Sequence, residues 1–216
     1  MKTRMRLYSL SLFALLMFAM ESSADTNSGG VQHLLTLGNR HFVLSRPLHP
    51  RQSRERRNEI VREQHPVAAV LSCADSRVPP ELVFDMGLGD FFVVRVAGNI
   101  VNDDILGSLE YAVEHLHLGV IVVLGHTSCG AVNAAVTGKL THTHIDSIID
   151  AIAPAVEKAR AVGGDLERNS ERANVLQSVE ALKSDTSILA AAMKAGKLQV
   201  VGAIYDLKTG KVSWVH

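Results

Sequence analysis

The segment PVAAVLSCADSRVPPE, residues 66–81, guides the interpretation of the rest of the chain. Its first residues form an apolar, partly β-branched run that is typical of a buried β-strand. Cys73, Asp75 and Arg77 follow at alternate positions. Charged side chains are seldom buried without a partner, so a strand that leads directly into a thiol, a carboxylate and a guanidinium indicates a functional site. If the strand continued through them, all three side chains would share one face.

Two further apolar runs resemble this strand, namely DFFVVRVAG (90–98) and GVIVVLGH (119–126). Such short runs, bounded by polar or turn residues, are typical of strands that are buried on both faces of a parallel sheet. The segment between them, 103–118, has the amphipathic pattern of a helix and is long enough for a right-handed crossover. The chain is therefore expected to contain a β-α-β unit.

The remaining segments complete a single α/β domain. Helices are expected over 31–44, 145–161, 170–183 and 186–195. The segment 197–215 is interpreted as a strand, a turn at 208–210 and a final antiparallel strand. The expected fold is a mostly parallel central β-sheet flanked by helices, with a C-terminal antiparallel edge strand.

The N-terminus has the pattern of a secretory signal peptide. Lys2, Arg4 and Arg6 precede the apolar stretch Leu7–Met20, and the small residues Ser22–Ala24 follow. The apolar stretch is shorter than the roughly 20 residues needed to span a bilayer. We therefore expect cleavage after Ala24, a mature domain of residues 25–216 in the periplasm or outside the cell, and no stable membrane insertion after cleavage.

The charge balance argues against a polyanionic partner. Lys and Arg together number 22, as do Asp and Glu. The arginine-rich stretch 51–63 is interleaved with glutamates at helical spacing, which is typical of a solvated helix face. We therefore expect no nucleic acid as a partner.

The chain has two cysteines, Cys73 and Cys129, which could form a disulfide or bind a metal. In an exported protein the simplest interpretation is a disulfide. However, Cys73 follows the first expected strand, His126 ends the third, and ligands of open α/β sheets bind beyond the carboxyl ends of strands. Cys129 lies where a helix is expected to begin, which favours a thiolate. Two thiolates and an imidazole are three of the four donors of a tetrahedral zinc site, whereas a disulfide would leave His126 without a role.

Three blocks, CADSRVPPE (73–81), GDFFVVRVAGN (89–99) and GHTSCGAV (125–132), resemble the β-class carbonic anhydrases. The resemblance is to bacterial, exported members of the plant-like branch. It implies one Zn²⁺ per chain, held by Cys73, His126 and Cys129, that activates water for attack on CO2 to give bicarbonate and a proton. Asp75 and Arg77 are implied to orient the reaction and to control the fourth metal position. The family also implies a homodimer, often paired into a homotetramer.

The same resemblance implies four substrate-binding residues, which are Gln64, Phe92, Ala97 and Tyr111. Ordinary core packing is an equally good explanation of Phe92 and Tyr111. Val70 stands where the other branch of the family has a tryptophan, so regulation by noncatalytic bicarbonate is not expected.

Three questions stay open from the sequence. Asp75 would contact either Arg77 or, in a closed form of the site, the zinc as a fourth ligand. The same site would also suit a hydrolase of a CO2 analogue such as carbonyl sulfide or CS2. A non-catalytic zinc- or bicarbonate-binding module is the third possibility.

Overall fold

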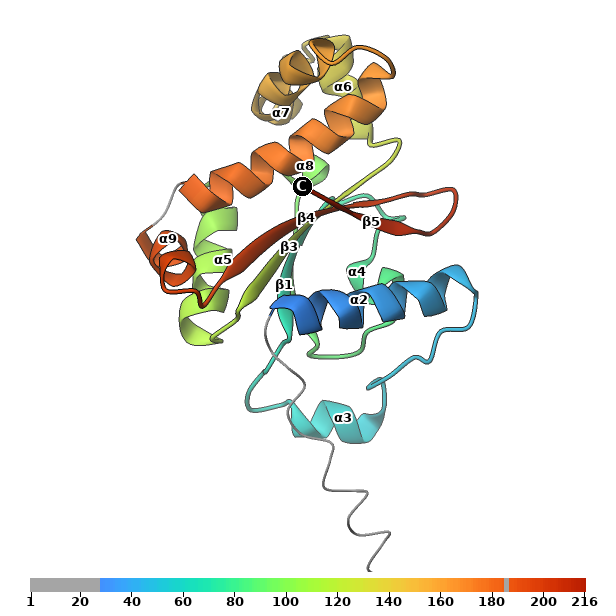
Figure 1. Cartoon of the computed structure of the whole chain (residues 1–216), viewed down its shortest axis with the longest axis vertical. Coiled ribbons are helices and arrows are strands. Elements are labelled where there is room, and N and C mark those ends of the chain that lie inside the picture. The colour runs from blue at the N-terminus through green and yellow to red at the C-terminus, as the bar shows by residue number, and fades with distance from the viewer. Residues whose placement is uncertain (1–27, 185–186) are drawn as a thin grey trace, which may run out of the picture.

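The computed structural model describes residues 28–184 and 187–216 (Figure 1). The expected signal peptide, residues 1–24, lies outside the described residues. The strands are β1 (Ala68–Ser72), β2 (Phe91–Arg95), β3 (Val120–His126), β4 (Gln199–Tyr205) and β5 (Val212–Val215). The helices are α2 (Ser28–Val43), α3 (Arg54–Glu59), α4 (Pro80–Val83), η1 (Ala97–Asn99), α5 (Asp103–His115), α6 (Gly130–Thr137), α7 (Ile145–Arg160), α8 (Leu166–Ser184) and α9 (Ser187–Lys194).

The strands form one sheet in the order β2-β1-β3-β4-β5. Strands β2, β1, β3 and β4 are parallel to their neighbours, and β5 pairs with β4 in the antiparallel sense. This arrangement confirms the expected fold class. The register pairs Ser72 of β1 with Leu124 of β3. The carboxyl ends of both strands, and the residues after them, therefore lie at the same edge of the sheet.

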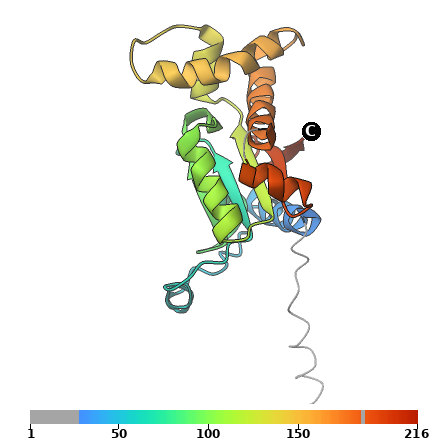
Figure 2. The ribbon, with the colours of Figure 1, turned by 90° about the vertical axis from the view of Figure 1, so that its left-hand side faces the viewer.

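Each face of the sheet is covered by its own set of helices (Figures 1 and 2). Because neighbouring side chains of a strand point to opposite faces, Ala69 and Leu71 pack into one apolar cluster while Ala68 and Val70 pack into another. Helices α5, α8 and α9 cover the first face, and α2 and α4 cover the second. Among the described residues no helix is both long and apolar enough to cross a bilayer.

A third apolar cluster lies beyond the carboxyl ends of the strands. It is built mainly from α6 and α7, which stand above the sheet in Figures 1 and 2, and it includes Cys73 and Cys129. The two sulfurs are therefore shielded by packed side chains at the edge of the sheet where α/β proteins bind ligands.

Three element boundaries differ from the sequence-based expectation. Strand β1 ends at Ser72, so Asp75 and Arg77 lie in a loop and the condition for a shared strand face is not met. Strand β2 ends at Arg95 because the chain turns into η1, where Gly98 has a φ of 70°. Helix α8 begins at Leu166 rather than near position 170, because the Asp165 carboxylate accepts a hydrogen bond from the Arg168 amide and caps the helix.

Candidate metal and catalytic site

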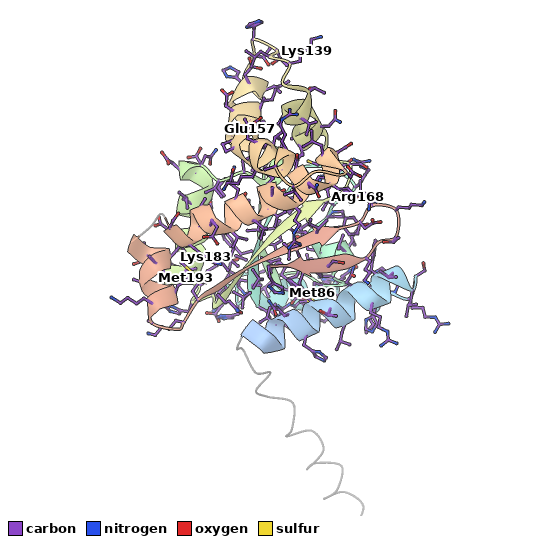
Figure 3. The ribbon with its side chains drawn as sticks, turned by 45° about the horizontal axis from the view of Figure 1, so that its top comes forward. Met86, Lys139, Glu157, Arg168, Lys183 and Met193 are labelled. Carbon is purple, nitrogen blue, oxygen red and sulfur yellow. The ribbon has the colours of Figure 1, made fainter. Side chains whose placement is uncertain are left out.

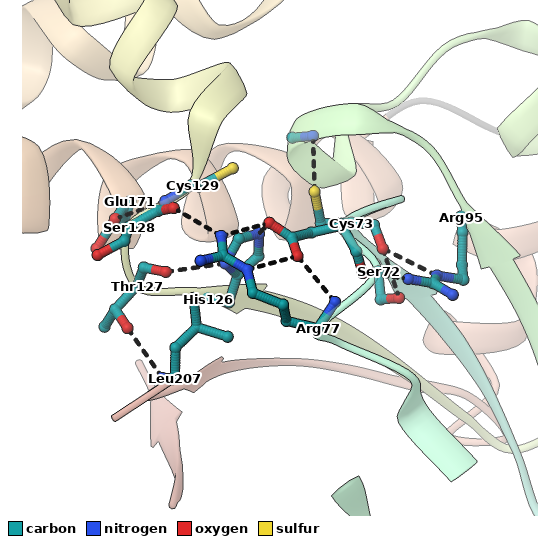
Figure 4. A network of polar contacts seen from close by, with 12 residues as sticks. Ser72, Cys73, Arg77, Arg95, His126, Thr127, Ser128, Cys129, Glu171 and Leu207 are labelled. Atoms are coloured by element: carbon teal, nitrogen blue, oxygen red, sulfur yellow. Dashed lines mark hydrogen bonds and ion pairs between the residues drawn. The ribbon is translucent and has the colours of Figure 1, made fainter. Parts of the chain in front are cut away.

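Two cysteines and a histidine meet at the carboxyl edge of the sheet (Figure 4). Cys73 directly follows β1, His126 is the last residue of β3, and Cys129 is the N-cap residue of α6. Their ligand atoms all lie within 4.8 Å of one another, and all three residues are buried. Both cysteines are free thiols, so the structure has no disulfide between them.

Local backbone geometry explains how three residues from separate segments converge. The pairing of β1 with β3 brings the end of each strand to one place. Ser128 then adopts a left-handed φ of 53°, which reverses the chain after His126 and lets Cys129 begin α6. A thiol at a helix N-terminus is in the environment that favours thiolate.

Hydrogen bonds adjust the proton affinity of the two sulfurs in opposite directions. The hydrogen bond from the Cys129 thiol lowers the pKa of Cys73 to about 4, and the same bond raises the pKa of Cys129. The Gly98 amide also donates to Cys73 Sγ, at 3.3 Å. Burial lowers the pKa of His126, but its contacts with Cys73, the Thr127 carbonyl and Asp75 together outweigh burial, so the pKa of the ring is raised. The contacts of Cys73 favour its thiolate, the form of cysteine that binds metals.

The geometry of His126 fits a metal ligand. Its Nδ1 lies 2.9 Å from the Thr127 carbonyl oxygen, which can only accept, so Nδ1 carries the proton. Its Nε2 is buried and has no hydrogen-bond partner. A histidine whose one nitrogen is fixed by a backbone carbonyl, with the other free beside two sulfurs, matches the way that proteins present imidazole to zinc.

Asp75 lies next to this group but is held by Arg77. Arg77 Nε and Nη2 donate to the two carboxylate oxygens at 2.9 and 2.6 Å, and the Arg77 amide donates to Oδ1 at 2.9 Å. These bonds hold the pKa of Asp75 well below its usual range. Asp75 Oδ2 is 3.9 Å from His126 Nε2, so the carboxylate lies at the margin of the donor group, paired with Arg77.

Two residues that the sequence analysis did not assign also support the site. Arg95, at the end of β2, donates to the carbonyl oxygens of Cys73 and Asp75 at 2.9 and 2.6 Å. Its position, a charge at the end of a strand, is the same feature that drew attention to Arg77. The buried Glu171 of α8 accepts a hydrogen bond from the Cys129 amide at 3.2 Å, and nothing in its local sequence indicates this role.

A cavity of about 460 Å³ opens beside the site. Its lining includes Arg77, Thr127, Ser128 and Glu171. Of the Asp75–Arg77 pair, Arg77 is the member that lines this cavity.

The four expected substrate-binding residues divide into two groups. Ala97 lies in η1, next to the Gly98 amide that contacts Cys73. The other three are distant from the metal-ligating residues along the sheet. Phe92 pairs with Ala69, four positions before Cys73, which corresponds to about 13 Å along the strand.

Tyr111 and Gln64 belong with Phe92. The ring centroids of Tyr111 and Phe92 are 6.1 Å apart, and Tyr111 is 47% exposed. Gln64 is exposed and precedes the amino end of β1, whereas Cys73 follows its carboxyl end. Phe92 and Tyr111 therefore pack together beside β2, and Gln64 lies before the end of β1 that is opposite to Cys73.

Comparisons with known proteins agree with this geometry. The family model for carbonic anhydrase matches residues 68–212. Carbonic anhydrase 2 of Mycobacterium tuberculosis is 40% identical over 191 residues, which cover 87% of this chain and 92% of the relative. The carbonic anhydrase of Mycolicibacterium smegmatis is 40% identical over 179 residues, which cover 81% of this chain and 87% of that protein.

Solved structures give the same result. The β-carbonic anhydrase CcaA superposes with a TM-score of 0.69 at 27% identity, over 76% of this chain and 85% of the other. A Coccomyxa β-carbonic anhydrase in complex with acetazolamide superposes with a TM-score of 0.66 at 30% identity, over 73% of this chain and 75% of the other. The chain belongs to the β-carbonic anhydrase family.

Proposed function

We propose that this protein catalyses the reversible hydration of CO2 to bicarbonate and a proton at a zinc ion held by Cys73, His126 and Cys129. One observation carries the proposal, which is a buried group of two sulfurs and an unpartnered imidazole nitrogen within 4.8 Å of one another. This donor set suits zinc and leaves one tetrahedral position for water or substrate. When bound, zinc lowers the pKa of a water molecule enough to provide a nucleophile near neutral pH.

Asp75 and Arg77 are proposed to orient the water that attacks CO2. An ionised carboxylate only accepts hydrogen bonds, and Arg77 keeps Asp75 ionised and in place. Asp75 is therefore placed to accept a hydrogen bond from the O–H of the attacking water, which fixes the direction of the lone pairs on the water oxygen. Because Arg77 occupies both carboxylate oxygens, Asp75 is restrained from moving onto the metal.

The substrate-binding role of Phe92, Tyr111 and Gln64 is proposed to require two copies of the chain. Phe92 is level with a position about 13 Å along the sheet from Cys73 of its own chain, Tyr111 packs against Phe92, and Gln64 precedes the opposite end of β1. In a dimer with two-fold symmetry, they are available to line the site of the partner, while Ala97 contributes to the site of its own chain. The tetrameric β-carbonic anhydrases of Sordaria macrospora are structural neighbours of this chain, which supports a homodimer or homotetramer.

Export is proposed from the N-terminal sequence. Residues 1–24 have the charge and apolar pattern of a signal peptide, so the mature chain is expected to begin at Asp25, in the periplasm or outside the cell. Mass spectrometry of the protein purified from a periplasmic extract tests this: an intact Met1 would overturn it.

The decisive experiment combines metal content with turnover. The purified mature protein should contain one zinc per chain by elemental analysis and hydrate CO2 rapidly in a stopped-flow assay. Cys73→Ser should lose both properties while keeping the far-ultraviolet circular dichroism of the fold. Release of sulfide from carbonyl sulfide or CS2 without CO2 hydration would identify an analogue hydrolase. Bound zinc without turnover of either kind would identify a binding module.

A further inference from the structure

Helix α8 carries a row of buried polar side chains on the face that packs toward the site. Glu171, Asn174 and Ser178 are spaced three and four residues apart, so they share one face of the helix. Their exposed fractions are only 3%, 1% and 3%. Figure 3 labels Arg168 and Lys183 near the two ends of α8, on either side of this row. Buried polar groups are unfavourable unless they form hydrogen bonds, so the partners of this row identify its purpose.

All three side chains bond to backbone atoms of segments that surround the sulfurs. Glu171 Oε1 accepts from the Cys129 amide at 3.2 Å (Figure 4). Asn174 Nδ2 donates to the Gly98 carbonyl at 2.7 Å. Ser178 Oγ donates to the Asn99 carbonyl at 2.9 Å. The three partners lie 42, 76 and 79 positions away along the chain.

A single residue, Gly98, connects the Asn174 side chain to the Cys73 sulfur by hydrogen bonds. Gly98 accepts from Asn174 with its carbonyl and donates its own amide to Cys73 Sγ at 3.3 Å. Gly98 has a φ of 70°. Glycine has no Cβ and can adopt many backbone conformations, so Gly98 would be free to reorient if its carbonyl were not held. Hydrogen bonds to a ligand atom are among the contacts that tune a metal site.

We propose that Glu171 and Asn174 are positioning residues that fix the two thiolate ligands from α8, Glu171 through the Cys129 amide and Asn174 through Gly98. Neither side chain touches the ligand atoms themselves. Their effect is to hold Cys129 at the start of α6 and to aim the Gly98 amide at Cys73. This inference rests on the proposed function, because it assumes that the three donors bind zinc.

Equilibrium competition between the protein and a chelator of known zinc affinity tests the proposal. Asn174→Ala should raise the zinc dissociation constant about 10- to 100-fold, the usual effect of losing a contact that supports a metal ligand. Glu171→Leu should act in the same direction. Glu171→Gln should keep the wild-type affinity, because its side-chain carbonyl still accepts the Cys129 amide. Glu171→Leu, which removes the bond to the Cys129 amide and leaves Asn174 unchanged, keeps the proposal testable if Asn174→Ala does not fold.

Gln177 provides a matched control on the same helix. Its Nε2 donates to the Ala151 carbonyl at 2.7 Å, the same length and kind of bond as that of Asn174, but toward α7 rather than toward the sulfurs. Gln177→Ala should therefore lose a hydrogen bond of the same kind without changing zinc affinity. The absorption spectrum of Co²⁺-substituted protein gives a second readout, since thiolate-to-cobalt bands should shift in Asn174→Ala and not in Gln177→Ala.

The possible outcomes separate the two proposals. If the wild-type protein binds no zinc, the proposed function fails. If the wild-type protein binds zinc, and Asn174→Ala and Glu171→Leu bind it equally tightly with unchanged Co²⁺ spectra, the positioning role is overturned. It is also overturned if Gln177→Ala weakens zinc binding as much as Asn174→Ala does, since the effect would then come from general stability.

Discussion

Arg77 holds Asp75 at the margin of the metal-ligating group with bonds from its amide, Nε and Nη2. Arg77→Ala should therefore retain zinc but lose CO2 hydration activity by about 10- to 100-fold, because the carboxylate that orients the attacking water loses its restraint. Elemental analysis and stopped-flow assays on the same sample measure both quantities. The side chain of Arg77 is 55% exposed, so its removal should have little effect on thermal stability.

Arg160→Ala is the matched control for this change. Arg160 is a similarly exposed arginine in an ion pair, with Glu157 at 3.2 Å, and it lies on α7 away from Asp75. It should keep full activity. Wild-type hydration by Arg77→Ala would show that the restraint of Asp75 is not needed, and loss of zinc together with activity would show that Arg77 supports the metal instead.

The buried carboxylate of Asp85 is important for stability rather than for activity. It accepts hydrogen bonds from the Leu48 and His49 amides at 2.7 and 3.0 Å and lies 3.2 Å from His41 Nδ1. Burial alone would raise its pKa, but these contacts outweigh burial, so the pKa of Asp85 is lowered from 3.8. The stabilisation it provides is therefore complete above the unfolded-state pKa and is lost as the pH falls through the lower folded-state pKa.

Asp85→Asn should reduce the free energy of unfolding by about 1–3 kcal/mol at pH 7, the usual value for a buried hydrogen bond to a charged group. The difference from wild type should shrink toward pH 3. Urea unfolding at both pH values measures it, with the exposed Asp150→Asn as a control that should change neither value. A difference that stays constant or grows in acid would contradict this assignment.

At the scale of elements, the contact between α8 and β3 depends on one glycine. A Cβ atom built on Gly125, the residue before His126, would collide with Cγ2 of Val175 on α8. Gly125→Ala should therefore reduce the free energy of unfolding by about 1–3 kcal/mol, the usual effect of overpacking. Adding Val175→Ala should recover part of this loss, so the double variant should be more stable than the sum of the single effects predicts.

Chemical denaturation measures the free energy of unfolding of these variants, and Gly107→Ala is the control. Gly107 lies in the interior of α5, and an added Cβ there would meet no atom within 4 Å. Alanine should stabilise this position by up to about 1 kcal/mol, because glycine is a poor helix former. Additive effects of Gly125→Ala and Val175→Ala would show that close approach of α8 is not what requires glycine.

The sequence was sufficient to predict the elements and the metal-binding group, but not the contacts between distant elements. Apolar runs predicted β1, β2 and β3. Because Cys73 follows β1 and His126 ends β3, the parallel pairing of these strands brings the two residues together. Glu171 was not predicted, because its role depends on a contact with a backbone amide 42 positions away that has no sequence pattern. A shared strand face for Asp75 and Arg77 depended on the strand continuing, and it ends at Ser72, so the two residues pair within a loop instead.

If Gln64, Phe92 and Tyr111 bind substrate, they must do so at the metal site of a second chain. Phe92 and Tyr111 stack on each other near the β2 edge, about 13 Å along the sheet from their own Cys73. A complementation experiment tests this arrangement. One chain carries Cys73→Ser and the other carries Phe92→Ala with Tyr111→Ala, each with a different affinity tag, and the mixed dimer is purified through both tags.

In the mixed dimer, one site combines intact metal ligands from one chain with intact rings from the other. If the rings act across the interface, CO2 hydration should recover to about half of the wild-type value per dimer, although both parent homodimers are nearly inactive. The reciprocal control pairs a wild-type chain with one that carries all three substitutions. That dimer should be nearly inactive, because its only intact metal ligands face the altered rings. The opposite pattern, an active control and an inactive mixed dimer, would place the rings in the site of their own chain.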